Sequence, residues 1–173
     1  MTTCHSSRAS NSLAAETFHD RPLDSTQFRR AMSKFGTGVT VISYDTDEGA
    51  VGMTANAFLS LSVNPPMILV SIRKESRFAT LLSAESRFGV SFLSAEQQAI
   101  SQHFGGKPNP EQGNPFGYLN QVPVINDALV SIQATVSNVY EGGDHLIYTA
   151  YVEKLEEKDG APLLYFGGQY TTV

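Results

Sequence analysis

The residue types and motifs that this sequence lacks argue against several kinds of chemistry. It contains one cysteine, Cys4, so no intrachain disulfide can form. Its four histidines show no paired spacing, which argues against a metal site. Neither the Gly-x-Ser-x-Gly motif of serine hydrolases nor the Gly-x-Gly-x-x-Gly motif of dinucleotide-binding folds occurs. We therefore expect neither a metalloenzyme, nor a triad hydrolase, nor a doubly wound dinucleotide fold.

Long hydrophobic runs and dense basic runs are also missing. The longest apolar run is far shorter than the roughly 20 residues that span a bilayer, so we expect no membrane association. The net charge is −5 without a Lys/Arg-rich segment, which argues against a nucleic-acid partner. Residues 1–21 lack the charged start and hydrophobic centre of a signal peptide. We expect a flexible tail over 1–21, one domain over 22–173 and a cytoplasmic location.

The apolar pattern predicts strands joined by hairpin turns, with a few short helices. Apolar residues from Phe28 to Phe35 recur with helical spacing, and Asp24 followed three residues later by Gln27 resembles a capping box. Met67–Ile72 is apolar throughout, as in a strand buried on both faces. The predicted helices are Ser25–Phe35, Phe78–Ala84 and Ala95–Phe104, and the predicted strands are Gly38–Tyr44, Val51–Asn56, Leu59–Val63, Met67–Ile72, Phe88–Leu93, Ala128–Tyr140, His145–Leu155 and Leu163–Phe166.

This order of elements favours a mainly β fold with helices. Strands and helices do not alternate regularly, and hairpin-type links dominate. We therefore expect an antiparallel β-barrel whose ends are filled by helices. Residues 105–121 are rich in Gly, Pro and Asn, which predicts a long loop with a functional or interface role.

The segment from Gly52 to Pro66 combines small residues with hydroxyls and an amide. Thr54 and Asn56 lie two apart on a predicted strand and share a face, while Ala55 points inward. Small residues let a ligand approach the backbone, and hydroxyl and amide groups can bond its polar edge. The alternative interpretation is a plain polar strand rim.

A phosphate-binding set follows the apolar strand. Arg73 and Lys74 are cations, and Ser71 and Ser76 add hydroxyls. Charge-assisted hydrogen bonds from such groups are what a phosphate requires. With the preceding segment, this set indicates a site for a planar, phosphorylated cofactor such as a flavin, although a solvated charged turn has the same composition.

Two further features fit such a site. His145 follows a Gly143-Asp144 turn at the start of a strand, where a histidine can contact a cofactor or move a proton. A lone histidine in a hairpin is otherwise structural or solvent-facing. The aromatic residues of 164–170 can stack on a ring or pack in the core.

Taken together, these segments resemble the short-chain flavin reductases, the reductase components of two-component flavin monooxygenases. The resemblance extends from Phe28 to Tyr170 and rests on the order and spacing of several short motifs. They are Phe28-Arg29-Arg30-Ala31-Met32, Gly36-Thr37-Gly38-Val39-Thr40-Val41, Gly52-Met53-Thr54-Ala55-Asn56-Ala57-Phe58, Ser60-x-Ser62-x-x-Pro65-Pro66, Gln102-His103-Phe104, Gly143-Asp144-His145 and Pro162-Leu163-Leu164-Tyr165.

The resemblance implies an FMN-binding type of split β-barrel that forms a homodimer, with the flavin site near the subunit interface. The implied activity is oxidation of NADH or NADPH with reduction of FAD or FMN. The reduced flavin then passes to a separate flavin-dependent oxygenase. No catalytic side chain is implied, because the task of the protein is to position two cofactors.

The family's cofactor contacts carry over to individual residues. Met53, Thr54, Ala55 and Asn56 would line the isoalloxazine and ribityl part, Ser71, Arg73 and Ser76 would hold the phosphate, Phe104 would pack near the flavin, and His145 would contact the nicotinamide nucleotide with Tyr170 nearby. Thr37, Gly52 and Ser60 belong to the matching motifs and complete the predicted set.

The sequence departs from the family pattern at two positions. Ala150 stands where members often have glycine, and Gly167 stands where they often have arginine. The second change removes a cation near the expected nucleotide site, so both NADH and NADPH stay open. A non-catalytic flavin-binding or electron-carrier protein of the same fold is the alternative. A pyridoxamine-phosphate oxidase relative lacks support, because no second phosphate-binding cluster is present.

Overall fold

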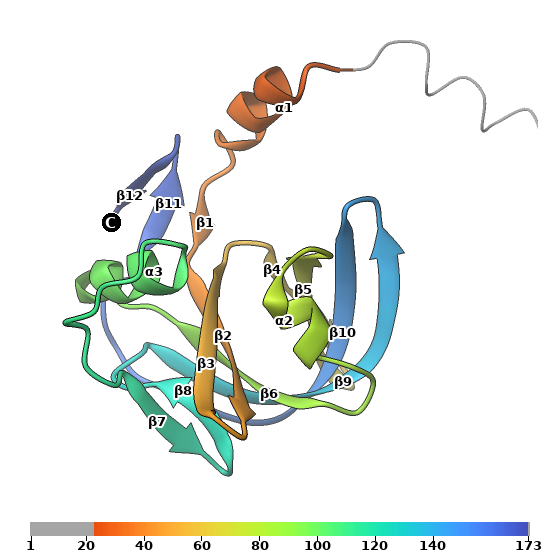
Figure 1. Ribbon diagram of the computed structural model, residues 1–173, viewed down its shortest axis with the longest axis vertical. Coiled ribbons are helices and arrows are strands. Elements are labelled where there is room, and N and C mark those ends of the chain that lie inside the picture. Colours follow the sequence, from red (N-terminus) through yellow and green to blue (C-terminus); the bar gives the residue numbers. More distant parts are fainter. Residues whose placement is uncertain (1–22, 173) are drawn as a thin grey trace, which may run out of the picture.

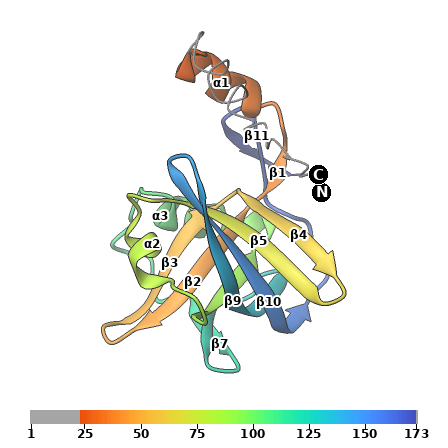
Figure 2. The ribbon, with the colours of Figure 1, turned by 90° about the vertical axis from the view of Figure 1, so that its right-hand side faces the viewer.

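A seven-stranded antiparallel sheet forms the body of the protein. The computed structural model describes residues 23–172. In this sheet the strands lie in the order β3-β2-β6-β9-β10-β5-β4, and they curl around a common core (Figures 1 and 2). Their bounds are β2 Thr40–Thr46, β3 Gly49–Ala55, β4 Phe58–Val63, β5 Pro66–Arg73, β6 Arg87–Phe92, β9 Val130–Gly142 and β10 His145–Glu157.

Two hydrophobic clusters hold these strands together. The larger one lies inside the curled sheet and includes Ile42, Val70, Phe88 and Tyr148, all without exposed surface. The smaller one includes Val39, Val41, Leu93, Ile125 and Leu163, against which Phe104 and Tyr170 pack. The smaller cluster therefore fixes the elements that surround one end of β3.

Three short helical elements cover the ends of the sheet, and side chains of serine start two of them. Ser76 caps α2 (Arg77–Leu81) by accepting from the Phe78 amide. Ser94 and Gln97 form a capping box at η1 (Ala95–Gln97), which leads directly into α3 (Gln98–Phe104). Helix α3 packs on β3.

A small three-stranded sheet lies beside α3, in the order β1-β11-β12. It joins the chain soon after its first helix to the C-terminal hairpin (Figure 1). Its strands are β1 Thr37–Gly38, β11 Leu164–Phe166 and β12 Gln169–Thr171, and a separate hairpin consists of β7 Phe116–Leu119 and β8 Val122–Ile125.

Helix α1 (Ser25–Met32) has no buried residue and projects away from the barrel (Figure 1). The Asp24 side chain accepts from the amides of Thr26 and Gln27, as the predicted cap requires. The apolar side chains Phe28, Met32 and Phe35 are exposed in the single chain.

The mainly β, antiparallel fold predicted from the sequence is confirmed, but several details are wrong. Strand β5 is not buried on both faces: Ile68, Val70 and Ile72 are buried, whereas the residues between them are only half-buried. The predicted loop 105–121 contains strand β7, whose partner β8 and the last strand β12 were not predicted. Helix α1 ends at Met32, three residues before the predicted end.

Three further expectations concern the N-terminal tail, membrane-spanning helices and metal-binding clusters. The predicted tail over 1–21 lies outside the described residues. No helix within 23–172 is long and apolar enough to cross a membrane. In the same range, no group of three or more His, Cys, Asp or Glu side chains is arranged to hold a metal ion.

Candidate cofactor site

The second half of β3 lies under helix α3. A Cβ atom at Gly52 would come within 2.9 Å of the Phe104 ring, so the absence of a side chain there lets the ring approach the strand. Two residues on, the Thr54 hydroxyl donates to the Ser101 carbonyl at 2.7 Å. The predicted contact residues Gly52, Thr54 and Phe104 are therefore brought together. Ala55, the residue after Thr54, is buried as predicted.

Helix α2 meets the same strand from its other side. The Ser76 hydroxyl lies 3.3 Å from the Met53 sulfur. A hollow next to this contact is lined by Gly52, Met53, Ser76, Arg77 and Phe104. Two predicted cofactor segments that are more than 20 residues apart in the sequence thus border one depression.

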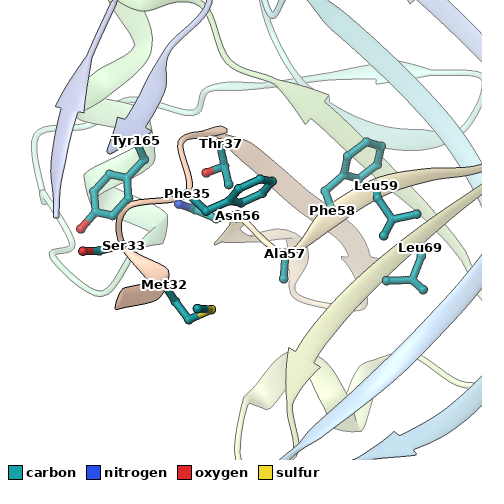
Figure 3. Close-up of a pocket in the computed structure, with 10 residues that line it drawn as sticks. All are labelled: Met32, Ser33, Phe35, Thr37, Asn56, Ala57, Phe58, Leu59, Leu69 and Tyr165. Atoms are coloured by element: carbon teal, nitrogen blue, oxygen red, sulfur yellow. The ribbon is translucent and has the colours of Figure 1, made fainter. Parts of the chain in front are cut away.

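A second hollow of about 440 Å³ opens beyond the end of β3. Figure 3 shows its lining, with Thr37 and Asn56 near Phe35, and with Leu59 and Leu69 contributed by the neighbouring strands β4 and β5. The Thr37 hydroxyl oxygen is buried and lacks a hydrogen-bond partner among the described residues. An unpaired buried polar atom is costly, so this oxygen is a candidate for bonding a ligand.

The end of β5 brings Ser71 and Arg73 next to the start of β10, where Arg73 pairs with His145 and Ser71 pairs with Ile147. Ser71 and Arg73 lie on the outward face of β5, because the alternate residues Val70 and Ile72 are buried. The Ser71 amide donates to the Ala57 carbonyl at 3.0 Å, which joins β5 to the segment after β3. Three predicted segments, the end of β3, the end of β5 and the His145 turn, therefore lie next to one another.

Arg73 is the cation at this edge that forms no ion pair with a described carboxylate. Lys74 binds Glu141 at 3.2 Å, whereas none of the described carboxylates is within ion-pair distance of Arg73. The Asp144 carboxylate contacts His145 Nδ1 at 2.7 Å. This hydrogen bond, with the charges of His145 and Arg73, holds the pKa of Asp144 below its ordinary value. Asp144 thereby orients the imidazole of His145.

The C-terminal hairpin places Tyr170 against α3. The Tyr170 hydroxyl lies 2.9 Å from the Ser101 hydroxyl, and its ring meets the Tyr165 ring edge-on at 5.2 Å between centroids. Gly167 and Gly168 form the turn with φ values of 61° and 84°. Because such values favour glycine, this turn explains Gly167 at a position where the related family often has arginine.

The structure differs from the predicted site at two serines, one predicted but unconnected and one connected but not predicted. Ser60 is exposed on β4, where it pairs with Ile68, and no hydrogen bond of its side chain occurs within the described residues. Ser101 is the reverse case, because it joins Thr54 to Tyr170 but was not predicted. Its neighbours Gln102-His103-Phe104 belong to a matching motif, which was the signal that linked this predicted helix to the site.

Comparison with known proteins gives a consistent result. Residues 32–173 match the family model "Flavin reductase like domain". The chain is 33% identical over 148 residues to an NADH-dependent flavin reductase of a Rhodococcus species, covering 84% of each chain. It is 34% identical over 144 residues to the reductase component of 4-hydroxyphenylacetate 3-monooxygenase of Thermus thermophilus, covering 83% of this chain and 93% of that one.

Solved structures agree with the sequence relatives. The flavin reductase PheA2 superposes with a TM-score of 0.84 at 37% identity, covering 87% of this chain and 99% of that one.

Proposed function

Because the chain belongs to the flavin reductase-like family, we propose that it is an NADH-dependent flavin reductase that supplies reduced FAD or FMN to a separate monooxygenase. The observation that carries the proposal is the convergence of the β3 end, the outward residues of β5 and the His145 turn on one side of the barrel. Relatives named as an NADH-dependent flavin reductase and as the reductase component of a monooxygenase support both parts of it.

The residues present fit a flavin. The buried, unpaired Thr37 hydroxyl and the Asn56 amide border an apolar hollow that suits an aromatic ring system. Arg73 and the hydroxyls of Ser71 and Ser76 provide charge-assisted and neutral bonds for a phosphate. In this proposal Thr37, Met53, Thr54, Ala55 and Asn56 surround the ring and ribityl part.

The nicotinamide nucleotide is assigned to two polar aromatic side chains from different elements. They are His145, held by Asp144, and Tyr170, held by Ser101. When bound, the two cofactors would supply the chemistry themselves, the nicotinamide as hydride donor and the flavin as hydride acceptor. The protein has no covalent step to perform, so its residues act by orienting the two ligands and excluding water. Such positioning accounts for roughly 7–11 kcal/mol of barrier in favourable cases.

A steady-state assay in air tests the proposed activity. Purified protein is added to NADH with FAD or with FMN, and the loss of NADH absorbance is followed. We expect consumption of NADH that requires both the protein and a flavin. Repeating the assay with NADPH measures the preference for the hydride donor. A yellow protein that consumes neither donor would favour the non-catalytic flavin carrier instead.

His145→Ala is expected to raise the KM for NADH about three- to tenfold while changing the KM for flavin less than about twofold. The loss of one hydrogen bond and its ordered contact explains a change of this size. Equal increases in the two KM values for His145→Ala would contradict the role assigned to His145.

We also propose that two copies of the chain form a homodimer. An isolated helix of eight residues is marginal in water, yet α1 buries none of its residues within its own chain. The outer faces of β4 and β5 present Leu59, Met67 and Leu69, which are at best half-buried. A second copy that covers both surfaces would bury them and lie next to the hollow that contains Thr37 and Asn56.

Phe28→Glu is expected to shift this dimer toward monomer, with an association at least about tenfold weaker, because a charge would replace buried apolar surface. The mass in solution is measured by sedimentation velocity over a range of concentrations. Leu155→Glu is the matched control, since Leu155 is 53% exposed and Phe28 50%, but Leu155 lies beyond the last residue of β10 that pairs with β5. A wild-type monomer at all concentrations would refute the proposed dimer.

The cytoplasmic location and the single domain over 22–173 remain predictions from the sequence.

A further inference from the structure

Ser101 lies where three separate elements meet. It sits in α3 and has no exposed surface. Its carbonyl accepts the hydrogen bond from Thr54 on β3, and its hydroxyl pairs with the Tyr170 hydroxyl on β12. One residue therefore bonds the strand assigned to the flavin and the hairpin assigned to the nicotinamide nucleotide.

The bond to Thr54 uses a carbonyl at the end of a helix. In a continuing helix, the Ser101 carbonyl would accept from the Gly105 amide, but that amide donates to the Gln102 carbonyl instead. A Cβ atom at residue 105 would lie 2.8 Å from the Ser101 oxygen, so Gly105 leaves that oxygen uncrowded. Thr54 thus satisfies an acceptor that the helix itself leaves open.

The bond to Tyr170 ties the C-terminal hairpin to α3. Strands β11 and β12 are three residues each and belong to a small sheet outside the seven-stranded one. Their turn consists of the glycines Gly167 and Gly168, both exposed. The Ser101 hydroxyl is the one side-chain hydrogen-bond partner of the Tyr170 hydroxyl within the described residues, so it fixes the polar end of a ring whose apolar part packs on Tyr165.

We propose that Ser101 is a positioning residue that sets the place of Tyr170, and thereby the nicotinamide-nucleotide half of the site, relative to Thr54 in the flavin half. The proposal rests on the proposed function for the assignment of ligands to the two halves. Its two bonds are chemically separable: replacing Ser101 by alanine removes the hydroxyl that meets Tyr170 but keeps the carbonyl that meets Thr54.

Equilibrium binding without turnover tests this separation. The dissociation constants of NAD⁺ and of oxidised FAD are measured by calorimetry for wild type, Ser101→Ala, Tyr170→Phe and the double variant. We expect Ser101→Ala to weaken NAD⁺ about three- to tenfold and to change FAD less than about twofold. Because both substitutions remove the same bond, the double variant is expected to bind NAD⁺ about as weakly as either single variant.

Ser91→Ala is the matched control. Ser91 is also fully buried and accepts from the Ile125 amide at 2.8 Å, but it lies on β6 away from α3. This variant is expected to lose thermal stability while keeping both dissociation constants within about twofold of wild type. It therefore shows the effect of losing a buried serine hydroxyl that has no part in the site.

Three results would overturn the proposal: unchanged NAD⁺ binding by Ser101→Ala, equal weakening of NAD⁺ and FAD, or fully additive effects of Ser101→Ala and Tyr170→Phe. If wild type binds both ligands and Ser101→Ala behaves like it, only the role of Ser101 fails. If wild type binds neither NAD⁺ nor FAD, the proposed function fails as well.

Discussion

Replacing Arg73 by alanine is expected to weaken flavin binding about 10- to 100-fold, because each charge-assisted bond to a phosphate contributes about 1.5–3 kcal/mol. Arg73 ends β5 on the outward face, and the neighbouring cation Lys74 is already bound to Glu141. The measurement is the dissociation constant for FMN and for FAD, from quenching of flavin fluorescence at two salt concentrations. Binding to wild type is expected to weaken more steeply with salt than binding to the variant.

Arg87→Ala is the control for this experiment. Arg87 is also an exposed arginine at a strand end, with its Nε 3.9 Å from Glu153, but it lies on β6. Its removal is expected to leave flavin affinity within about twofold, because its charge is screened from the site. Equal losses for Arg73→Ala and Arg87→Ala would mean that the phosphate is held elsewhere.

Gly89→Ala is expected to lower the free energy of unfolding by about 3 kcal/mol or more, at the upper end of what overpacking costs. Gly89 is buried in β6, where β8 crosses closely. An added Cβ would lie 2.0 Å from the Pro123 carbonyl oxygen and 2.6 Å from the Ser43 hydroxyl oxygen. A backbone oxygen cannot swing aside as a side chain can, so the β7–β8 hairpin would have to move. Chemical denaturation followed by circular dichroism measures the change.

Gly113→Ala is the matched glycine substitution. No atom lies within 4 Å of the position that its Cβ would take, and residue 113 is exposed. This variant is expected to stay within about 0.5 kcal/mol of wild type. A Gly89→Ala variant as stable as Gly113→Ala would show that β8 does not pack on β6 as closely as described.

The parts of the fold that were predicted correctly depend on short-range chemistry. Asp24 caps α1, Ser94 begins the helical segment before α3, and Gly143-Asp144 turns β9 into β10, each through contacts within a few residues. Strand β8 was missed because Pro123 is unfavourable in a strand, and pairing with β7 and packing under Gly89 hold the segment extended.

The prediction for β5 failed for a different reason. An apolar run such as Met67–Ile72 indicates burial of both faces, but it does not say whether one chain or two bury them. Within the single chain only Ile68, Val70 and Ile72 are buried. The half-buried Met67 and Leu69 are what the proposed homodimer would cover.

The candidate site was predictable in its segments but not in its connections. Thr54, Ser76, Arg73 and His145 were selected because hydroxyls, cations and a histidine follow strands and turns. The bonds that join the segments, Ser76 to Met53 and Thr54 to Ser101, span 23 and 47 residues. No local pattern specifies such contacts, so an ordinary buried serine in a short helix gave no signal.

Anaerobic reduction of flavin tests the central claim most directly. Purified protein is mixed with NADH and an excess of FAD or FMN in the absence of oxygen, and the visible absorbance of the flavin is followed. The account predicts that the flavin bleaches with multiple turnovers, far faster than in a protein-free control. No acceleration over that control with either flavin, and with NADPH in place of NADH, would contradict the assignment of this chain as a flavin reductase.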